Sequence, residues 1–171
     1  MTFRLQAAAV AAALVLAACG GGGADTTPVA PIHKVKVAGD SLADSGTFGI
    51  KFTVQGAGTN GGPTQIWVDR VAANFGQSLC AHYLSTDRTS FASSSGCTNY
   101  AVGGGRINYY DAPTSPYSIV QQLKDMGAAG FGSDELLLVD GGGNDAADLI
   151  KAYILASLGA EAGYKALLGT V

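Results

Sequence analysis

The sequence has little charge, and its positive charge is especially sparse. Only 13% of the residues are charged, with 10 Lys and Arg against 13 Asp and Glu, which leaves a net charge of −3. No run of basic residues occurs, and this argues against a nucleic-acid partner. Because 47% of the residues are hydrophobic, the chain is not a disordered polyelectrolyte. Its 171 residues are enough for about one domain.

A long apolar run is also missing. The most apolar segment, residues 7–18, is shorter than the roughly 20 residues that cross a bilayer. It follows Arg4, so residues 1–18 are typical of a secretory signal peptide. The segment ends Leu-Ala-Ala-Cys, which resembles a bacterial lipobox with Cys19 as the lipidated residue. An ordinary signal peptide with an incidental cysteine is the alternative.

The segment after Cys19 predicts where the protein resides. In residues 19–31, Cys19 is followed by a run of glycines at 20–23, which is typical of a flexible tether between an anchor and a domain. A cysteine that carries several acyl chains is a stable membrane anchor. We therefore expect an exported protein that is lipid-anchored in the bacterial cell envelope through Cys19, and Gly20 favours the outer membrane.

Cysteine is scarce beyond the anchor. Cys80 and Cys97 are the two that remain, and an even pair in an exported chain favours a disulfide. Closing so short a loop stabilises a fold by about 3 kcal/mol in the chain-entropy model. Two free thiols are the alternative.

The hydrophobic pattern alternates between strand-like and helix-like segments after residue 31. Partial alternation over 32–38 and a continuous apolar run over 136–139 indicate strands, the second of them buried in a parallel sheet. Residues 39–63 are expected to form turns around one short helical piece, and 77–98 a polar loop. Helical spacing predicts helices over 64–75, 118–126, 145–158 and 160–168. The pattern favours an α/β fold with layers and a parallel sheet, formed by a domain that spans 32–171.

Glycine is abundant, with 25 residues, but it shows no Gly-x-y period, which excludes collagen. Two of its clusters and one serine fall at or near the ends of predicted strands, where α/β folds gather their sites. Ser41 follows the first strand and is placed as a nucleophile at a helix start, although a helix cap is the simpler interpretation. Residues 103–105 expose backbone amides that can bind an oxyanion. Asn144 follows the run 136–139 and adds a side-chain donor, with Asp145 as a helix cap.

Taken together, these clusters resemble a known family. Gly-Asp-Ser-Leu at 39–42, Asn-Tyr-Ala-x-Gly-Gly at 99–104 and Gly-Gly-x-Asn-Asp at 141–145 resemble the SGNH hydrolases, also called the GDSL lipase/esterase family. The resemblance implies a flavodoxin-like, three-layer α/β/α fold and the hydrolysis of small-molecule or lipid carboxylic esters. It carries Ser41 over as the nucleophile. It assigns the oxyanion donors to the Ser41 N–H, the Gly104 N–H and the Asn144 side chain, with Gly103 or Gly105 as alternatives to Gly104.

One block of that family is absent. The family carries its catalytic histidine in an Asp-x-x-His block near the end of the domain, whereas this sequence has only His33 and His82, neither with an aspartate three residues earlier. A serine without an adjacent base is a poor nucleophile. We therefore expect a fragment that lacks the end of the domain and is nearly inactive as it stands. A non-catalytic envelope binding module is the alternative.

Three other patterns carry weaker hypotheses. Residues 56–61 match G-x-G-x-x-G, but Gly62-Pro63 interrupts the helix entry and no suitable acidic residue follows, so we expect no nucleotide cofactor. Three aspartates, Asp140, Asp145 and Asp148, lack the spacing of a calcium loop, and we expect no metal. Tyrosines in the loop 106–117 are candidates for the wall of an acyl pocket, or anchor that loop: Tyr109, Tyr110 and Tyr117.

Overall fold

The computed structural model describes residues 31–54, 64–157 and 159. The chain divides into two compact units, Met1–Pro31 and Ile32–Val171. The elements of the second unit, in chain order, are β1 (Lys34–Ala38), α2 (Trp67–Asn74), β2 (Tyr83–Leu84), β3 (Ala92–Ser93), α3 (Ile119–Ala128), β4 (Glu135–Val139) and α4 (Gly143–Ser157). The predicted signal peptide, residues 19–30 of the tether, the G-x-G-x-x-G segment and the helix over 160–168 lie outside the described residues.

β1 lies at the centre of a parallel arrangement. It pairs in parallel with β4, with Lys34 opposite Glu135 and Ala38 opposite Val139. On its other side, Val37 forms a parallel bridge with Asn99, and Asn99 forms another with Ala81. The parallel strand predicted over 136–139 is thus confirmed, and the general α/β class with it.

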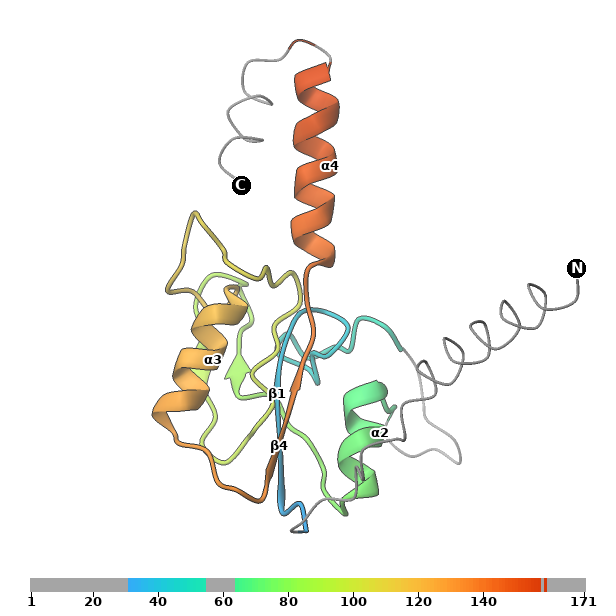
Figure 1. The fold of residues 1–171 in the computed structure, drawn as a ribbon, viewed down its shortest axis with the longest axis vertical. Helices are drawn as coiled ribbons and strands as arrows, with labels where there is room; N and C mark the ends of the chain where they lie inside the picture. The colour runs from blue at the N-terminus through green and yellow to red at the C-terminus, as the bar shows by residue number, and fades with distance from the viewer. Residues whose placement is uncertain (1–30, 55–63, 158, 160–171) are drawn as a thin grey trace, which may run out of the picture. The chain divides into compact units, whose positions relative to one another are not determined.

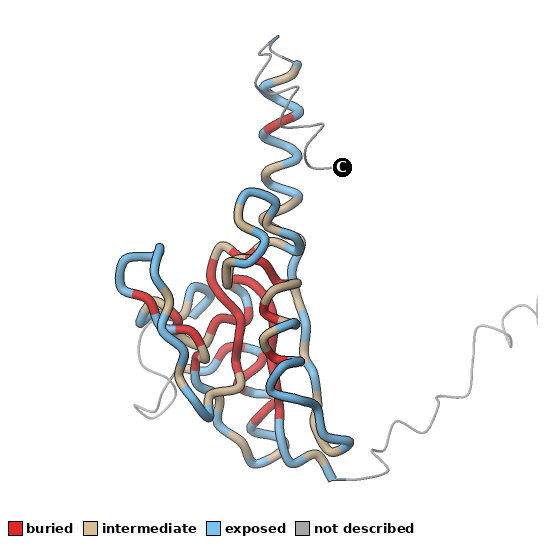
Figure 2. Tube along the Cα trace, turned by 90° about the vertical axis from the view of Figure 1, so that its left-hand side faces the viewer, coloured by how far each residue is buried: buried red, intermediate tan, exposed pale blue. Residues whose placement is uncertain are grey.

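The two faces of β1 pack against different helices. Val35 and Val37 are fully buried in a cluster that contains Val68 and Ala72 of α2. Ala38 belongs to a second cluster with Ile119 and Met126 of α3. Because side chains alternate along a strand, α2 and α3 cover opposite faces, as Figure 1 shows. The buried residues gather around the strands (Figure 2).

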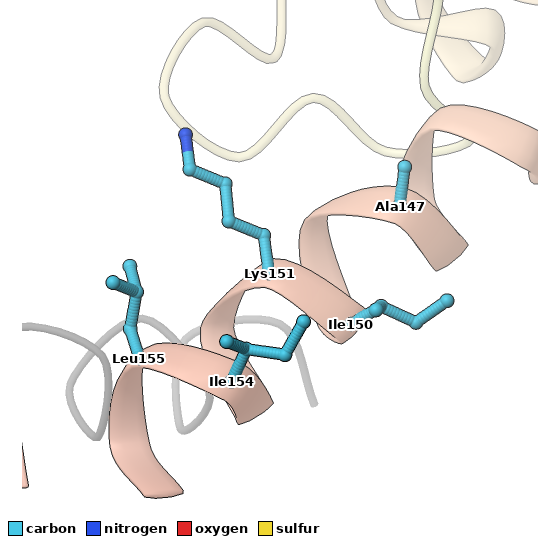
Figure 3. A pocket seen from close by; sticks show the side chains of 5 residues that line it. All are labelled: Ala147, Ile150, Lys151, Ile154 and Leu155. Carbon is cyan, nitrogen blue, oxygen red and sulfur yellow. The ribbon is translucent and has the colours of Figure 1, made fainter. Parts of the chain in front are cut away.

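α4 differs from α2 and α3 because its apolar side chains remain largely exposed. Ile150 is 60% and Tyr153 66% exposed, and Ala152 is its only buried residue within the described part of the helix. Figure 3 shows one side of α4, where the apolar side chains lie beside Lys151 and line a shallow pocket on the helix surface.

Several predicted boundaries were wrong. Helix α2 begins at Trp67, not 64, because the Asp69 carboxylate accepts the Ile66 N–H at 3.0 Å and so fixes the helix start. Helix α4 begins at Gly143, so Asp145 lies in its first turn and is not its cap. Turns and bends replace the expected helical piece over the described part of 39–63.

The segment predicted as a polar loop over 77–98 contains more order than its composition indicates. β2 and β3 form a short antiparallel pair, with Tyr83 opposite Ser93. Cys80 and Cys97, at the two ends of this segment, are joined in the disulfide that the cysteine count predicts. The disulfide lies close to the bridge between Ala81 and Asn99, because Cys80 directly precedes Ala81 and Cys97 is two residues before Asn99.

Candidate functional site

Ser41 lies in the turn that follows β1. The turn is closed by Asp40, whose carboxylate Oδ1 accepts the Leu42 N–H at 2.9 Å and whose carbonyl accepts the Ala43 N–H at 3.2 Å. Ser41 is half-buried, and neither its hydroxyl nor its backbone N–H has a hydrogen-bond partner among the described residues. A hydroxyl and an amide of one residue are therefore both available to a ligand.

The residue before Asp40 lies against the turn after β4. A Cβ at Gly39 would lie 1.8 Å from Oδ1 of Asp140, the residue that follows β4, so a larger residue there would displace the Asp140 carboxylate. The same Asp140 oxygen accepts the Asp40 N–H at 3.2 Å, so the turns after β1 and β4 are joined directly. Burial raises the pKa of Asp140, and the nearby Asp40 carboxylate adds to the rise.

The second turn, residues 103–105, contains one free amide. The Gly103 N–H donates to Oδ2 of Asp44 at 2.8 Å, and the Gly105 N–H donates to the Val102 carbonyl at 2.9 Å. The Gly104 N–H has no partner in the part of the chain that the structure describes. Gly104 also adopts a φ of +89°, a backbone conformation that favours glycine.

Buried polar side chains hold the first two turns together. The Asp44 carboxylate, fully buried, accepts the Gly46 and Thr47 N–H groups as well as that of Gly103. Its burial raises its pKa, although these N–H groups act in the opposite direction. Asn99 is also fully buried, and its Nδ2 donates to the Ala43 carbonyl at 2.7 Å. The backbone around Ser41 is therefore anchored from the neighbouring segment of the sheet.

Asn144 joins the third turn to the second. Its Nδ2 donates to the Gly105 carbonyl at 2.8 Å, which uses one of the two hydrogens of the amide and leaves the other. Gly105 in turn packs against the turn that follows β1, because a Cβ there would lie 3.0 Å from the Gly39 carbonyl oxygen and 3.5 Å from Cα of Asp40. The structure thus brings together the turns that contain Ser41, Gly104 and Asn144.

The three aspartates near this site have other partners. Asp140 accepts the Asp40 N–H, Asp145 accepts the Ile107 N–H, and Asp148 forms an ion pair with Arg106. Over the described residues, no three potential metal ligands lie close enough together to hold an ion.

Within the described structure, neither histidine is hydrogen-bonded to Ser41. His33 precedes β1, and its backbone N–H donates to the Asp134 carbonyl just before β4, at the opposite end of the strands from Ser41. The His82 ring stacks on the Tyr100 ring, with 4.0 Å between the ring centroids, and His82 Nδ1 lies 3.2 Å from the Cys97 carbonyl oxygen.

Aromatic side chains cover the second turn. Tyr117 lies against Gly104, since a Cβ there would be 3.6 Å from its ring, and Tyr109 packs edge-on against Tyr117. Tyr110, in contrast, is 76% exposed. The sequence hypothesis did not include Phe52, whose ring occupies the space where a Cβ of Gly103 would lie.

No protein-family model matches the chain, and no curated protein matches it either. The interpretation of the site therefore depends on its geometry. Cys19 lies outside the described residues.

Proposed function

We propose that the chain carries the serine and oxyanion half of a carboxylic-ester hydrolase of the SGNH type. Ser41 is the nucleophile. The oxyanion donors are the Ser41 N–H, the Gly104 N–H and the Asn144 side chain. No cofactor or metal takes part, and the substrate is a small-molecule or lipid ester.

The observation that carries this proposal is the set of free donors. Of the three glycine amides at 103–105, two are used within the described structure, and the one that remains is Gly104. The Ser41 N–H likewise has no hydrogen-bond partner among the described residues, and one of the two Asn144 amide hydrogens is not used by the Gly105 carbonyl. Amides aimed at a developing negative charge are the main source of stabilisation in acyl transfer.

The strand order supports the finer fold assignment. β1 is the first strand in the chain. The segment around Asn99 lies on one side of it, with Ala81 beyond that segment, and β4 lies on the other side. We assign the Asn99 segment, β1 and β4 to strands 2, 1 and 3 of a flavodoxin-like sheet, in which the direction of strand addition reverses at the first strand. Ligands bind beyond the carboxyl ends of the strands at such a reversal, where Ser41 and Asn144 lie.

The proposed chemistry needs a base that neither His33 nor His82 supplies. Ser41 attacks the ester carbonyl while a base removes its proton, and the base then returns the proton to the alcohol that leaves. The donors bind the oxyanion of the tetrahedral intermediate. Because the described residues place no hydrogen-bonded base on Ser41, we expect turnover far below that of an ordinary esterase, since serine and base act as a unit.

The test separates the reactivity of Ser41 from turnover. The purified chain is treated with a fluorophosphonate probe, with and without added imidazole as an external base, and labelled peptides are mapped by mass spectrometry. We expect label on Ser41 that imidazole accelerates and that Ser41→Ala removes. Ser45→Ala is the matched control, because the Ser45 hydroxyl is engaged with Asp69 and Asn99.

A label spread over exposed serines, or absent from Ser41 even with imidazole, would refute the proposal. Either result would favour a non-catalytic binding module in the cell envelope.

We also propose that the protein is exported and held in the cell envelope by a lipid on Cys19. Within the described residues, none of the helices has the length and apolar character needed to cross a membrane. Metabolic labelling with an alkyne fatty acid should modify the full chain and not Cys19→Ser. Equal labelling of both would refute the anchor.

A further inference from the structure

Gln122 is an unusual residue for its position in α3. It is fully buried, on the same helix face as Ile119 and Met126, whereas glutamine is normally exposed. The spacing 119, 122, 123, 126 is that of a core-facing stripe. A buried amide in such a stripe is costly unless it is hydrogen-bonded, so its partners indicate why it is there.

The Gln122 amide binds both backbone groups of one residue in the serine turn. Its Oε1 accepts the Gly39 N–H at 2.8 Å, and its Nε2 donates to the Gly39 carbonyl at 3.0 Å. The second hydrogen of Nε2 goes to the Pro116 carbonyl at 2.8 Å. Three of the four hydrogen-bonding positions of this amide are therefore used, and two of them act on Gly39.

Gly39 is where the regular pairing of β1 ends. The β1–β4 register ends at Ala38, and beyond it the backbone turns toward Ser41. A side-chain amide that donates to and accepts from one residue acts as a neighbouring strand would. The Gly39 carbonyl also accepts the Val102 N–H at 3.1 Å, so the same peptide is held from α3 and from the segment before Gly103.

We propose that Gln122 is the positioning residue for the nucleophile turn: from α3 it fixes the Gly39 backbone and so sets the direction of the Ser41 N–H and hydroxyl. This rests on the proposed function in that positioning matters only if Ser41 reacts. An error of about 1 Å in a reacting group lowers a rate by roughly 100-fold, so a contact two residues away is sufficient to control reactivity.

Two substitutions of Gln122 test the inference. Gln122→Met keeps the approximate volume and removes both polar groups. Gln122→Glu keeps an acceptor, and it keeps a donor only while the introduced carboxyl is protonated. We expect Gln122→Met to slow fluorophosphonate labelling of Ser41 by roughly 10- to 100-fold. Gln122→Glu should recover much of the labelling at about pH 5.5 and lose it at about pH 8, as the buried carboxyl ionises.

Hydrogen exchange separates positioning from reactivity. In Gln122→Met the Gly39 amide, which has lost its acceptor, should exchange at least about tenfold faster than in the unmodified chain, measured against the Val37 amide in β1. The matched control is Gln121→Met, because Gln121 is half-buried on the same helix and its amide donates to Asp125 instead.

The outcomes are distinct. If Ser41 of the unmodified chain is never labelled, the proposed function fails, and the exchange data alone decide the role of Gln122. If the Gly39 and Val37 amides accelerate equally in Gln122→Met, the residue stabilises the fold in general, and the inference is wrong. The inference is also wrong if Ser41 labelling falls as much in Gln121→Met as in Gln122→Met. It is wrong as well if labelling of Gln122→Glu, relative to the unmodified chain, does not depend on pH.

Discussion

Replacement of Asp44 by asparagine changes one atom of a fully buried side chain and should destabilise the protein severely. The carboxylate accepts three backbone N–H groups: Gly46 and Thr47 on Oδ1, at 2.8 and 2.7 Å, and Gly103 on Oδ2, at 2.8 Å. In Asp44→Asn the amide oxygen can keep the first two. The amide nitrogen then faces the Gly103 N–H, so two donors point at each other.

The expected cost follows from those two groups. A buried polar group left without a partner costs about 1–3 kcal/mol, and Asp44→Asn creates two of them, the Gly103 N–H and the new side-chain NH2. We expect a loss of about 2–6 kcal/mol out of a total stability on the order of 5–15 kcal/mol. For a domain of this size the melting temperature should fall by roughly 5–15 °C.

The assay is urea unfolding, followed by circular dichroism, of the chain and two variants. Asp87→Asn is the matched control, because Oδ1 of Asp87 likewise accepts two N–H groups, from Thr89 at 2.9 Å and Ser90 at 2.8 Å, but in an exposed turn. An asparagine there keeps both contacts and leaves nothing buried, so the midpoint should hardly move. Equal shifts in the two variants, or no shift in Asp44→Asn, would refute the argument that the contact to Gly103 carries the cost.

The sequence predicted best what depends on neighbours in the chain. The apolar run before Asp140 indicated a parallel strand, and the structure pairs it with β1. The position of the turn after β1 was predicted correctly because Gly39 and Ser41 lie directly after a strand pattern, but the helix expected to start at Ser41 is a turn. These features are encoded within about ten residues, which is the range over which hydrophobic period and turn chemistry act.

Contacts between distant segments could not be predicted in the same way. The choice among the amides at 103–105 was left open by the sequence. The Gly105 N–H is used locally by the Val102 carbonyl, but Gly103 is excluded by its contact with Asp44, 59 residues away, and Gly104 remains free among the described residues. The role of Gln122 depends on Gly39, 83 residues away. A polar residue on the apolar face of the helix over 118–126 was a visible signal of a buried partner, although it did not identify Gly39.

Two further predictions concern contacts outside the site. Removal of the disulfide by Cys97→Ser should cost about 3 kcal/mol, because the bond closes a loop with a sequence separation of 17. Urea unfolding would measure the loss, and an unchanged midpoint would contradict it. The hydrogen bond from Lys36, 2.7 Å away, lowers the pKa of Glu135 from 4.5 to about 2. A lowered folded-state pKa gives stability that is present above the unfolded value and lost as pH falls through the folded one. The advantage of the unmodified chain over Glu135→Gln in unfolding free energy should therefore be full above pH 4.5 and shrink toward about pH 2. An advantage that stays constant over this window would mean that the ion pair with Lys36 does not stabilise the fold.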